Sequence, residues 1–195
     1  MTTASAVWRD VVRIRETVPL VHNITNYVVM NTTANALLAI GASPVMAHAI
    51  DEVEDLVRLA GALVINIGTL SPAWVDAMFR AGGEASKKGI PIVLDPVGAG
   101  ATPYRTDTAQ RLSRDVSPAI IRGNASEIRA LVQADATARG VDSTHSTEES
   151  VDHARRVAGQ YRCTVSMSGA TDIIVSSDAT TRVGNGHPIM PRITG

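Results

Sequence analysis

The chain has 195 residues, which is enough for one well-buried domain and too few for two comfortable ones. Apolar residues make up 45% and charged residues 19%, values that fit a globular protein and exclude a disordered one. The net charge is −1 and no block of Lys and Arg stands out, so nothing indicates nucleic acid or a membrane surface as a partner. Only one cysteine is present, and the N-terminus lacks the regions of a secretory signal, so we expect a cytoplasmic protein.

Helix-like and strand-like segments alternate along the first third of the chain. Apolar residues at helical spacing over 7–18 predict an amphipathic first helix. Residues 26–40 predict a largely apolar, buried helix that ends at Gly41. We expect short strands around it, at 20–25, 44–47 and 62–67.

Two further helices carry start signals. Asp51 can cap a helix, with Glu54 three residues later in the capping-box position. Ser71 followed by Pro72 is typical of an N-cap and a first helical residue. This second helix is expected to end at the Lys-Lys-Gly sequence of 87–89, because cations and then glycine favour a helix C-terminus.

The same alternation continues to the C-terminal part. Helices are expected at 104–115, from about 125 and from 147, and strands at 91–94, 119–122, 163–167, 172–176 and 180–183, the last two as a hairpin. This pattern predicts an α/β fold in which a mostly parallel sheet has helices on both faces, within a single domain over 1–195. No helix follows the final PIMPRITG, so we expect C-terminal helices to be missing from this chain.

Ligands bind beyond the carboxyl ends of the strands in open parallel sheets, which directs attention to two carboxylates. Asp95 ends a predicted strand before a glycine-containing loop, and it could hold Mg²⁺ or act on a substrate hydroxyl. An Asp that only caps a turn is the alternative for an Asp-Pro pair. Glu127 could bind Mg²⁺ at the next strand-to-helix junction, but its spacing from Asn124 also fits a capping box, which spacing alone favours.

Two other strand ends could contact phosphate. Arg122 could pair with a phosphate through its planar guanidinium, or form a surface ion pair. Ser168 beside Gly169 could give a phosphate a hydroxyl donor and close access to the backbone. The alternative is that the two residues form an ordinary turn. Cys163 lies within a strand pattern and is better explained as buried than as nucleophilic. The chain has neither a Walker motif nor G-x-G-x-x-G, which argues against P-loop NTPases and Rossmann dehydrogenases.

Taken together and in order, several segments resemble the hydroxyethylthiazole kinase family. They are VHNITNYVVMNTTANALLAIGASPVMA at 21–47, GALVINIGTL at 61–70, PIVLDPVGAGATPYRT at 91–106, IIRGNASEI at 120–128, TVSMSGATDII at 164–174 and GNGHPIMPRITG at 184–195. The resemblance implies a ribokinase-like fold and a homotrimer with active sites between subunits. It also implies ATP-dependent phosphorylation of 4-methyl-5-(2-hydroxyethyl)thiazole in thiamine biosynthesis and salvage.

The resemblance also implies roles for individual residues. Asn26, Met46 and Gly195 would contact the thiazole alcohol, Arg122 and Ser168 would contact ATP, and Asp95 and Glu127 would organise Mg²⁺. Ser168 stands where the family usually has Thr, which keeps the hydroxyl. The family's catalytic residue, usually Cys, is expected just after Gly195 at the start of an anion-binding helix, so we expect little or no activity from these 195 residues alone.

Two other functions remain open from the sequence. The chain could belong to a related ribokinase-like kinase, such as one acting on a hydroxymethylpyrimidine. It could also be a non-catalytic module that binds a thiazole or a nucleotide. Turnover with a panel of acceptor alcohols would distinguish the first alternative from a thiazole kinase. Binding without turnover would support the second alternative.

Overall fold

A computed structural model describes residues 4–133, 147–189 and 192. In this part of the chain, eight strands form one sheet with the order β2-β1-β3-β4-β5-β6-β7-β8. The first six strands are mutually parallel, and β7 is antiparallel to both of its neighbours, which confirms the predicted mostly parallel sheet with a final hairpin. The strands are β1 (Leu20–Ile24), β2 (Ser43–Met46), β3 (Ala62–Asn66), β4 (Ile92–Asp95), β5 (Ile120–Asn124), β6 (Thr164–Ser168), β7 (Asp172–Val175) and β8 (Thr180–Val183).

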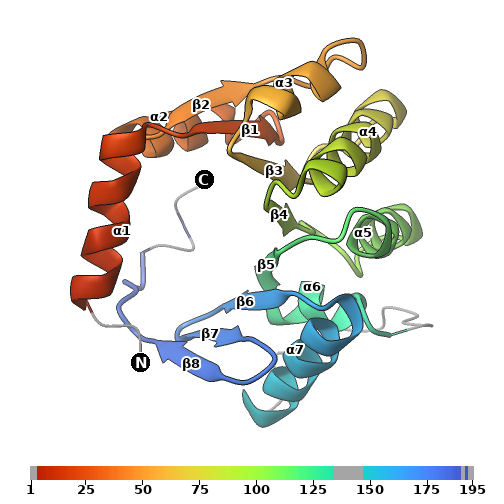
Figure 1. The fold of residues 1–195 in the computed structure, drawn as a ribbon. Coiled ribbons are helices and arrows are strands. Elements are labelled where there is room, and N and C mark those ends of the chain that lie inside the picture. The colour runs from red at the N-terminus through yellow and green to blue at the C-terminus, as the bar shows by residue number, and fades with distance from the viewer. Residues whose placement is uncertain (1–3, 134–146, 190–191, 193–195) are drawn as a thin grey trace.

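The helices alternate with the parallel strands. They are α1 (Ala4–Thr17), α2 (Met30–Ile40), α3 (Val53–Leu59), α4 (Pro72–Lys88), α5 (Pro103–Asp115), α6 (Ala125–Ala130) and α7 (Thr147–Tyr161). The sheet curves into an arc with α3, α4, α5 and α7 along its outer side, while α1 lies beyond the end formed by α2 and β2 (Figure 1). Among the described residues, none of the helices combines the length and the apolar character needed to cross a bilayer.

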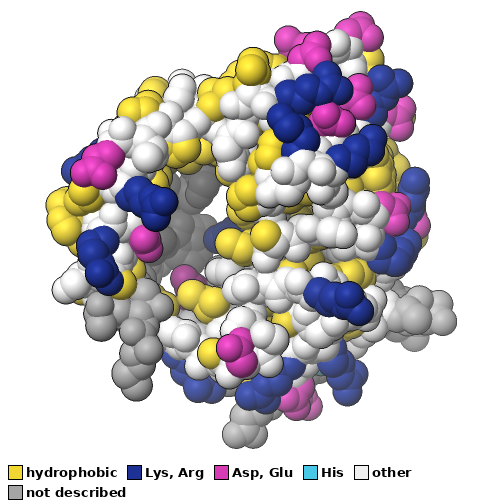
Figure 2. Space-filling model, viewed as in Figure 1, with side chains coloured by type: hydrophobic (Ala, Val, Ile, Leu, Met, Phe, Trp, Pro, Cys, Tyr) yellow, Lys and Arg dark blue, Asp and Glu magenta, His cyan; other side chains and the backbone are white. Residues whose placement is uncertain are grey.

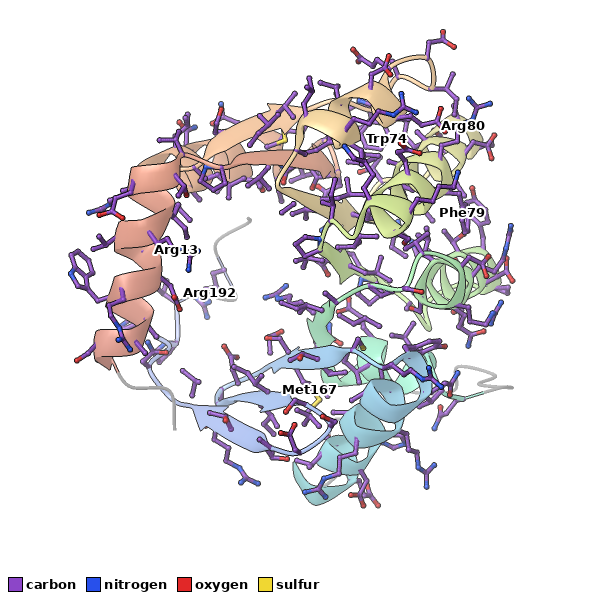
Figure 3. All side chains as sticks on the ribbon, in the orientation of Figure 1. Arg13, Trp74, Phe79, Arg80, Met167 and Arg192 are labelled. Carbon is purple, nitrogen blue, oxygen red and sulfur yellow. The ribbon has the colours of Figure 1, made fainter. Side chains whose placement is uncertain are left out.

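Burial alternates along the central strands because their two faces have different neighbours. Ile121 in β5 is buried, whereas Ile120 and Arg122 on either side of it are exposed. Met167 of β6 is buried on the side of the sheet next to α6 and α7 (Figure 3). Each fully buried Ile or Leu on this covered face contributes about 1.5–3 kcal/mol to stability, so this face forms the core.

The ends of α4 follow their predicted chemistry. The Ser71 hydroxyl accepts a hydrogen bond from the backbone nitrogen of Trp74 at 3.3 Å, and Pro72 is the first helical residue. Gly89 ends the helix in the left-handed region at φ +69°, where a side chain would be strained. The predicted cap of α3 is wrong, because the helix begins after Glu52 and makes no side-chain cap there.

The prediction for residues 26–40 is wrong in two respects. The helix α2 begins only at Met30, because the side-chain oxygen of Asn26 accepts hydrogen bonds from the backbone nitrogens of Val28 and Val29 and forms a turn there. None of the residues in α2 is buried. The helix packs against β2, which is the edge strand of the sheet, so an apolar sequence alone did not place it in the core.

Candidate active site

Three polar side chains meet where three neighbouring parallel strands end. Asn66 and Asp95 are the last residues of β3 and β4 and lie opposite each other in the strand register, while Asn26 follows β1. The Asn26 side-chain amide donates to Asn66 Oδ1 at 2.8 Å, and Asn66 Nδ2 donates to Asp95 Oδ2 at 2.8 Å. The parallel pairing of β1, β3 and β4 therefore produces a continuous hydrogen-bonded chain at the carboxyl edge of the sheet.

Asp95 is held in an environment that disfavours its charge. Its side chain is 17% exposed, and within the described residues its Oδ1 atom makes no hydrogen bond. Burial raises the pKa of Asp95 to about 6, opposed by the positive charge of Arg122 and the hydrogen bond from Asn66 and assisted by the negative charge of Glu127. A cation lies close by, since the guanidinium of Arg122 is 3.8 Å from Asp95 Oδ2.

A hollow of about 470 Å³ adjoins this chain of side chains. It contains three of the residues predicted to form the site, namely Asn26, Asp95 and Arg122. Its other lining residues come from the strand ends and the start of α2: Thr25, Val28, Val29, Thr33, Val64, Asn66, Gly68, Thr69 and Val97. Figure 2 shows the molecule's open side, where hydrophobic side chains border a depression. A mostly apolar hollow with a few converging polar groups is the usual form of a small-molecule site.

Glu127 makes the capping box that its spacing predicts and also a longer connection. Its Oε2 atom accepts from the backbone nitrogen of Asn124 at 2.8 Å, while the Asn124 side chain accepts from the backbone nitrogen of Glu127 at 3.0 Å. Its Oε1 atom accepts from the backbone nitrogen of Gly98 at 2.8 Å. Glu127 therefore ties the loop after β4 to the start of α6, a few residues from Asp95.

The remaining predicted residues that the structure describes do not line the hollow. Met46 is the half-buried last residue of β2, beside Asn23 of β1. Ser168 ends β6 opposite Asn124, and its hydroxyl lies 3.5 Å from the backbone oxygen of Gly123. Gly195 lies outside the described residues. Asn26, Asp95 and Arg122 are thus brought together, whereas Met46 and Ser168 end strands on either side of them and Glu127 lies in the first turn of α6.

Two residues of this region were missed from the sequence. Asn66 ends the apolar run of β3, and its polar side chain at a carboxyl strand end was the signal that could have indicated it. Arg105 of α5 gave no such signal. Its guanidinium donates to the backbone oxygens of Ile67, Gly68 and Val97 at 2.8–2.9 Å, and so joins the loops that follow β3 and β4.

The carboxylates suit a hard cation that keeps water and phosphate ligands. Magnesium is typically bound through one or two carboxylates together with waters and substrate phosphates. Asp95 has a buried oxygen without a hydrogen-bond partner among the described residues, which fits such a role directly. Both oxygens of Glu127 already accept backbone hydrogen bonds, so this residue fits contact through water better. The described residues hold no cluster of three or more His, Cys, Asp or Glu side chains that would form an all-protein metal site.

A second hollow, of about 500 Å³, lies between α7 and the turn joining β7 to β8. Its lining includes Arg155 and Asp178 and none of the residues at the carboxyl ends of β1, β3 and β4. We place the candidate site at the strand ends, because the polar side chains there converge and the Asp95 carboxylate has a strongly raised pKa.

Comparison with known proteins identifies the family of the chain. The model of the Hydroxyethylthiazole kinase family matches residues 11–195. The chain belongs to this family. A hydroxyethylthiazole kinase from Syntrophus aciditrophicus is 58% identical over 194 residues, which cover 99% of this chain and 72% of that protein.

Solved structures of this family and of its wider fold are also similar to the chain. The structure of a hydroxyethylthiazole kinase protein from Pyrococcus horikoshii matches with a TM-score of 0.87 and 46% identity, covering 96% of this chain and 70% of that one. A ribokinase-like superfamily protein from Enterococcus faecalis matches with a TM-score of 0.59 at 12% identity, covering 88% of this chain and 64% of that one. The second likeness concerns the fold alone, and it confirms the predicted ribokinase-like architecture of this hydroxyethylthiazole kinase family member.

Proposed function

We propose that this protein transfers a phosphoryl group from ATP to the hydroxyl of 4-methyl-5-(2-hydroxyethyl)thiazole, a reaction of thiamine biosynthesis and salvage. The observation that carries the proposal is the convergence of Asn26, Asp95 and Arg122 on one hollow at the carboxyl edge of the sheet, in a chain of this family. Phosphoryl transfer depends mainly on positioning the reactants and on stabilising the phosphate charge. Polar side chains at the carboxyl edge of a sheet can do both.

The alcohol and the nucleotide are assigned to different parts of this edge. Asn26, which follows β1, and Met46, the last residue of β2, would contact the thiazole alcohol together with Gly195. Arg122 and Ser168, on β5 and β6, would contact ATP. The exposed guanidinium of Arg122 is free to approach phosphate oxygens in a paired geometry, for which arginine is well suited.

Asp95 and Glu127 would organise Mg²⁺ beside the nucleotide phosphates. A bound magnesium ion would neutralise phosphate charge during the transfer. Asp95 offers an oxygen without a hydrogen-bond partner in the described part of the chain, and Glu127 holds the adjoining loop in place. We assign none of the described residues as the base that removes the proton from the hydroxyl of the thiazole alcohol.

We also propose a homotrimer with active sites between subunits, in a cytoplasmic protein of one domain. The side chains of α1 and α2 support an assembly, because no residue of either helix is buried and large apolar residues such as Trp8 and Leu38 are exposed. Sedimentation equilibrium tests the trimer. A monomeric mass at the concentrations used for turnover would contradict it.

A panel of acceptor alcohols tests the proposed reaction. The protein as its gene encodes it is assayed with ATP and Mg²⁺ against the thiazole alcohol and a hydroxymethylpyrimidine. We expect kcat/KM to favour the thiazole by at least about 100-fold, as for a site that hydrogen-bonds its own substrate. A preference for the pyrimidine would move the assignment to the related kinases, and binding without turnover of either would favour a non-catalytic module.

A further inference from the structure

Asn66 occupies the middle of the hydrogen-bonded chain that joins the two halves of the proposed site. It accepts from Asn26 on the side assigned to the alcohol, and it donates to Asp95 on the side assigned to the metal and nucleotide, each at 2.8 Å. The residue is 7% exposed, and Asn66 is the last residue of a central strand. Its position therefore follows the sheet and is not set by a mobile surface loop.

The direction of these hydrogen bonds is fixed by neighbouring backbone nitrogens, which can only donate, and by an ionised carboxylate, which can only accept. The backbone nitrogen of Gly68 donates to Asn66 Oδ1 at 2.9 Å, so this atom must be the amide oxygen. The amide nitrogen of Asn66 consequently faces Asp95, whose ionised carboxylate can only accept. At the other end, the Val28 and Val29 backbone nitrogens fix the Asn26 oxygen and leave its nitrogen to donate to Asn66.

Close packing leaves these amides little room to move independently. A Cβ atom built on Gly68 would lie 2.6 Å from Asn26 Nδ2 and 2.9 Å from Asn66 Oδ1. The loop backbone thus lies directly against both amides. A shift of Asn26 on contact with a ligand must move Asn66 or break its hydrogen bond, and a shift of Asn66 moves the group that holds Asp95 Oδ2.

We propose that Asn66 is a positioning residue that couples the two ligands, so that the alcohol at Asn26 and the magnesium–nucleotide complex at Asp95 change each other's affinity through its side chain. This inference rests on the proposed function, which assigns the two ligands to the two ends of the chain. Such coupling is reciprocal and is measured as a ratio of dissociation constants. Asn66 lines the hollow, but this scheme gives it the role of holding Asn26 and Asp95 in place and not that of a catalytic residue.

Calorimetric titration of the protein as its gene encodes it tests the coupling. The thiazole alcohol is titrated alone and then with saturating Mg²⁺ and a non-hydrolysable ATP analogue. In the wild type we expect the Kd of the alcohol to change by about five-fold or more between the two titrations. In Asn66→Ala each ligand still binds alone, and we expect the ratio to fall to about 1, because the link between the half-sites is absent.

A second variant removes both bonds of the chain with little change of volume and no change of charge. Asn66→Leu has no donor for Asp95 and no acceptor for Asn26 or for the Gly68 backbone. We expect this variant to lose the coupling as well. It tests the coupling if Asn66→Ala does not fold. Gln160→Ala is the control, since Gln160 is an exposed amide on α7 and does not line the hollow, and it keeps the wild-type ratio. Thermal unfolding shows which variants are folded.

The outcomes separate this inference from the proposed function. A wild-type ratio of about 1, or an unchanged ratio in both folded Asn66 variants, overturns the coupling while turnover leaves the kinase assignment intact. Failure of the wild type to bind either ligand overturns the proposed function and this inference together. Loss of the ratio in the Asn66 variants but not in Gln160→Ala supports the role of Asn66.

Discussion

Glu127 Oε1 accepts a hydrogen bond from the backbone nitrogen of Gly98 at 2.8 Å, across the ends of two adjacent strands. The same carboxylate closes the capping box at the start of α6. One side chain thus fixes both a helix start and the loop after Asp95, and the capping and metal-organising interpretations of its sequence pattern are compatible.

Replacing Glu127 should destabilise the fold. Glu127→Ala leaves the Gly98 and Asn124 backbone nitrogens without their acceptors, and we expect the free energy of unfolding to fall by about 1–2 kcal/mol. Urea denaturation followed by circular dichroism measures the change. Glu16→Ala, at an exposed position of α1, is the control. Equal stability of Glu127→Ala and the wild type would show that the two hydrogen bonds contribute nothing.

Arg105 should be intolerant of lysine. The guanidinium reaches three carbonyl oxygens on two loops, whereas a lysine ammonium is compact and cannot span them. We expect Arg105→Lys to lower the free energy of unfolding by about 2 kcal/mol, the size of a charged hydrogen bond to a partly buried group. Arg111→Lys on the same helix should change it by less than about 0.5 kcal/mol, since Arg111 lies over Phe79 and pairs with Asp107 at the surface. Similar losses in both variants would refute the special role of Arg105.

The sheet and most helix ends were predictable because they depend on local chemistry. The buried runs at 62–67 and 91–94 identify central strands from their apolar continuity, and Ser71 and Gly89 specify the ends of α4. The placement of α2 was not predictable in this way. Its apolar residues suggest burial, yet it lies against an edge strand, and strand order is a tertiary property that no local pattern contains.

The candidate site was predictable only in part for a similar reason. Asn26 and Asp95 lie after or at a strand end, and Arg122 was expected at one, so the rule for parallel sheets predicts that they share one edge, although the structure places Arg122 in the middle of β5. Arg105 acts from a helix on a loop whose residues Ile67 and Gly68 lie 38 and 37 positions earlier in the chain, a relationship that depends on how α5 packs. The link from Asn26 through Asn66 to Asp95 likewise requires the strand order β1-β3-β4, which the sequence does not state.

Asp95 should make the metal-free protein less stable as the pH rises. Its pKa is about 6 when folded and near the ordinary 3.8 when unfolded, so the folded state binds the proton more tightly and loses this advantage between pH 4 and pH 6. Relative to the wild type, Asp95→Asn should therefore gain about 3 kcal/mol between pH 4 and pH 7, the equivalent of about two pKa units. Urea denaturation at each pH gives the difference. Parallel pH profiles for the two proteins would contradict the raised pKa.

Cys163 should be inert in the folded protein. The side chain is buried, and burial raises the pKa of its thiol to about 11, so very little reactive thiolate is present at pH 8. We expect alkylation by iodoacetamide to be at least about 100-fold slower in buffer than in concentrated urea. Mass spectrometry of timed samples measures both rates. Comparable rates would show that the thiol is accessible, contrary to its place in the core.

The central claim is that this edge of the sheet serves phosphoryl transfer to the thiazole alcohol, and the most direct measurement is alcohol-dependent ADP formation in a coupled assay with Mg²⁺. It is made with the protein as its gene encodes it, beside an Arg122→Ala variant. We predict turnover that requires the alcohol and falls by at least about 100-fold in Arg122→Ala, as for loss of a group that stabilises phosphate charge. Folded wild-type protein that binds both ligands but forms no ADP, or undiminished turnover in Arg122→Ala, would contradict the account.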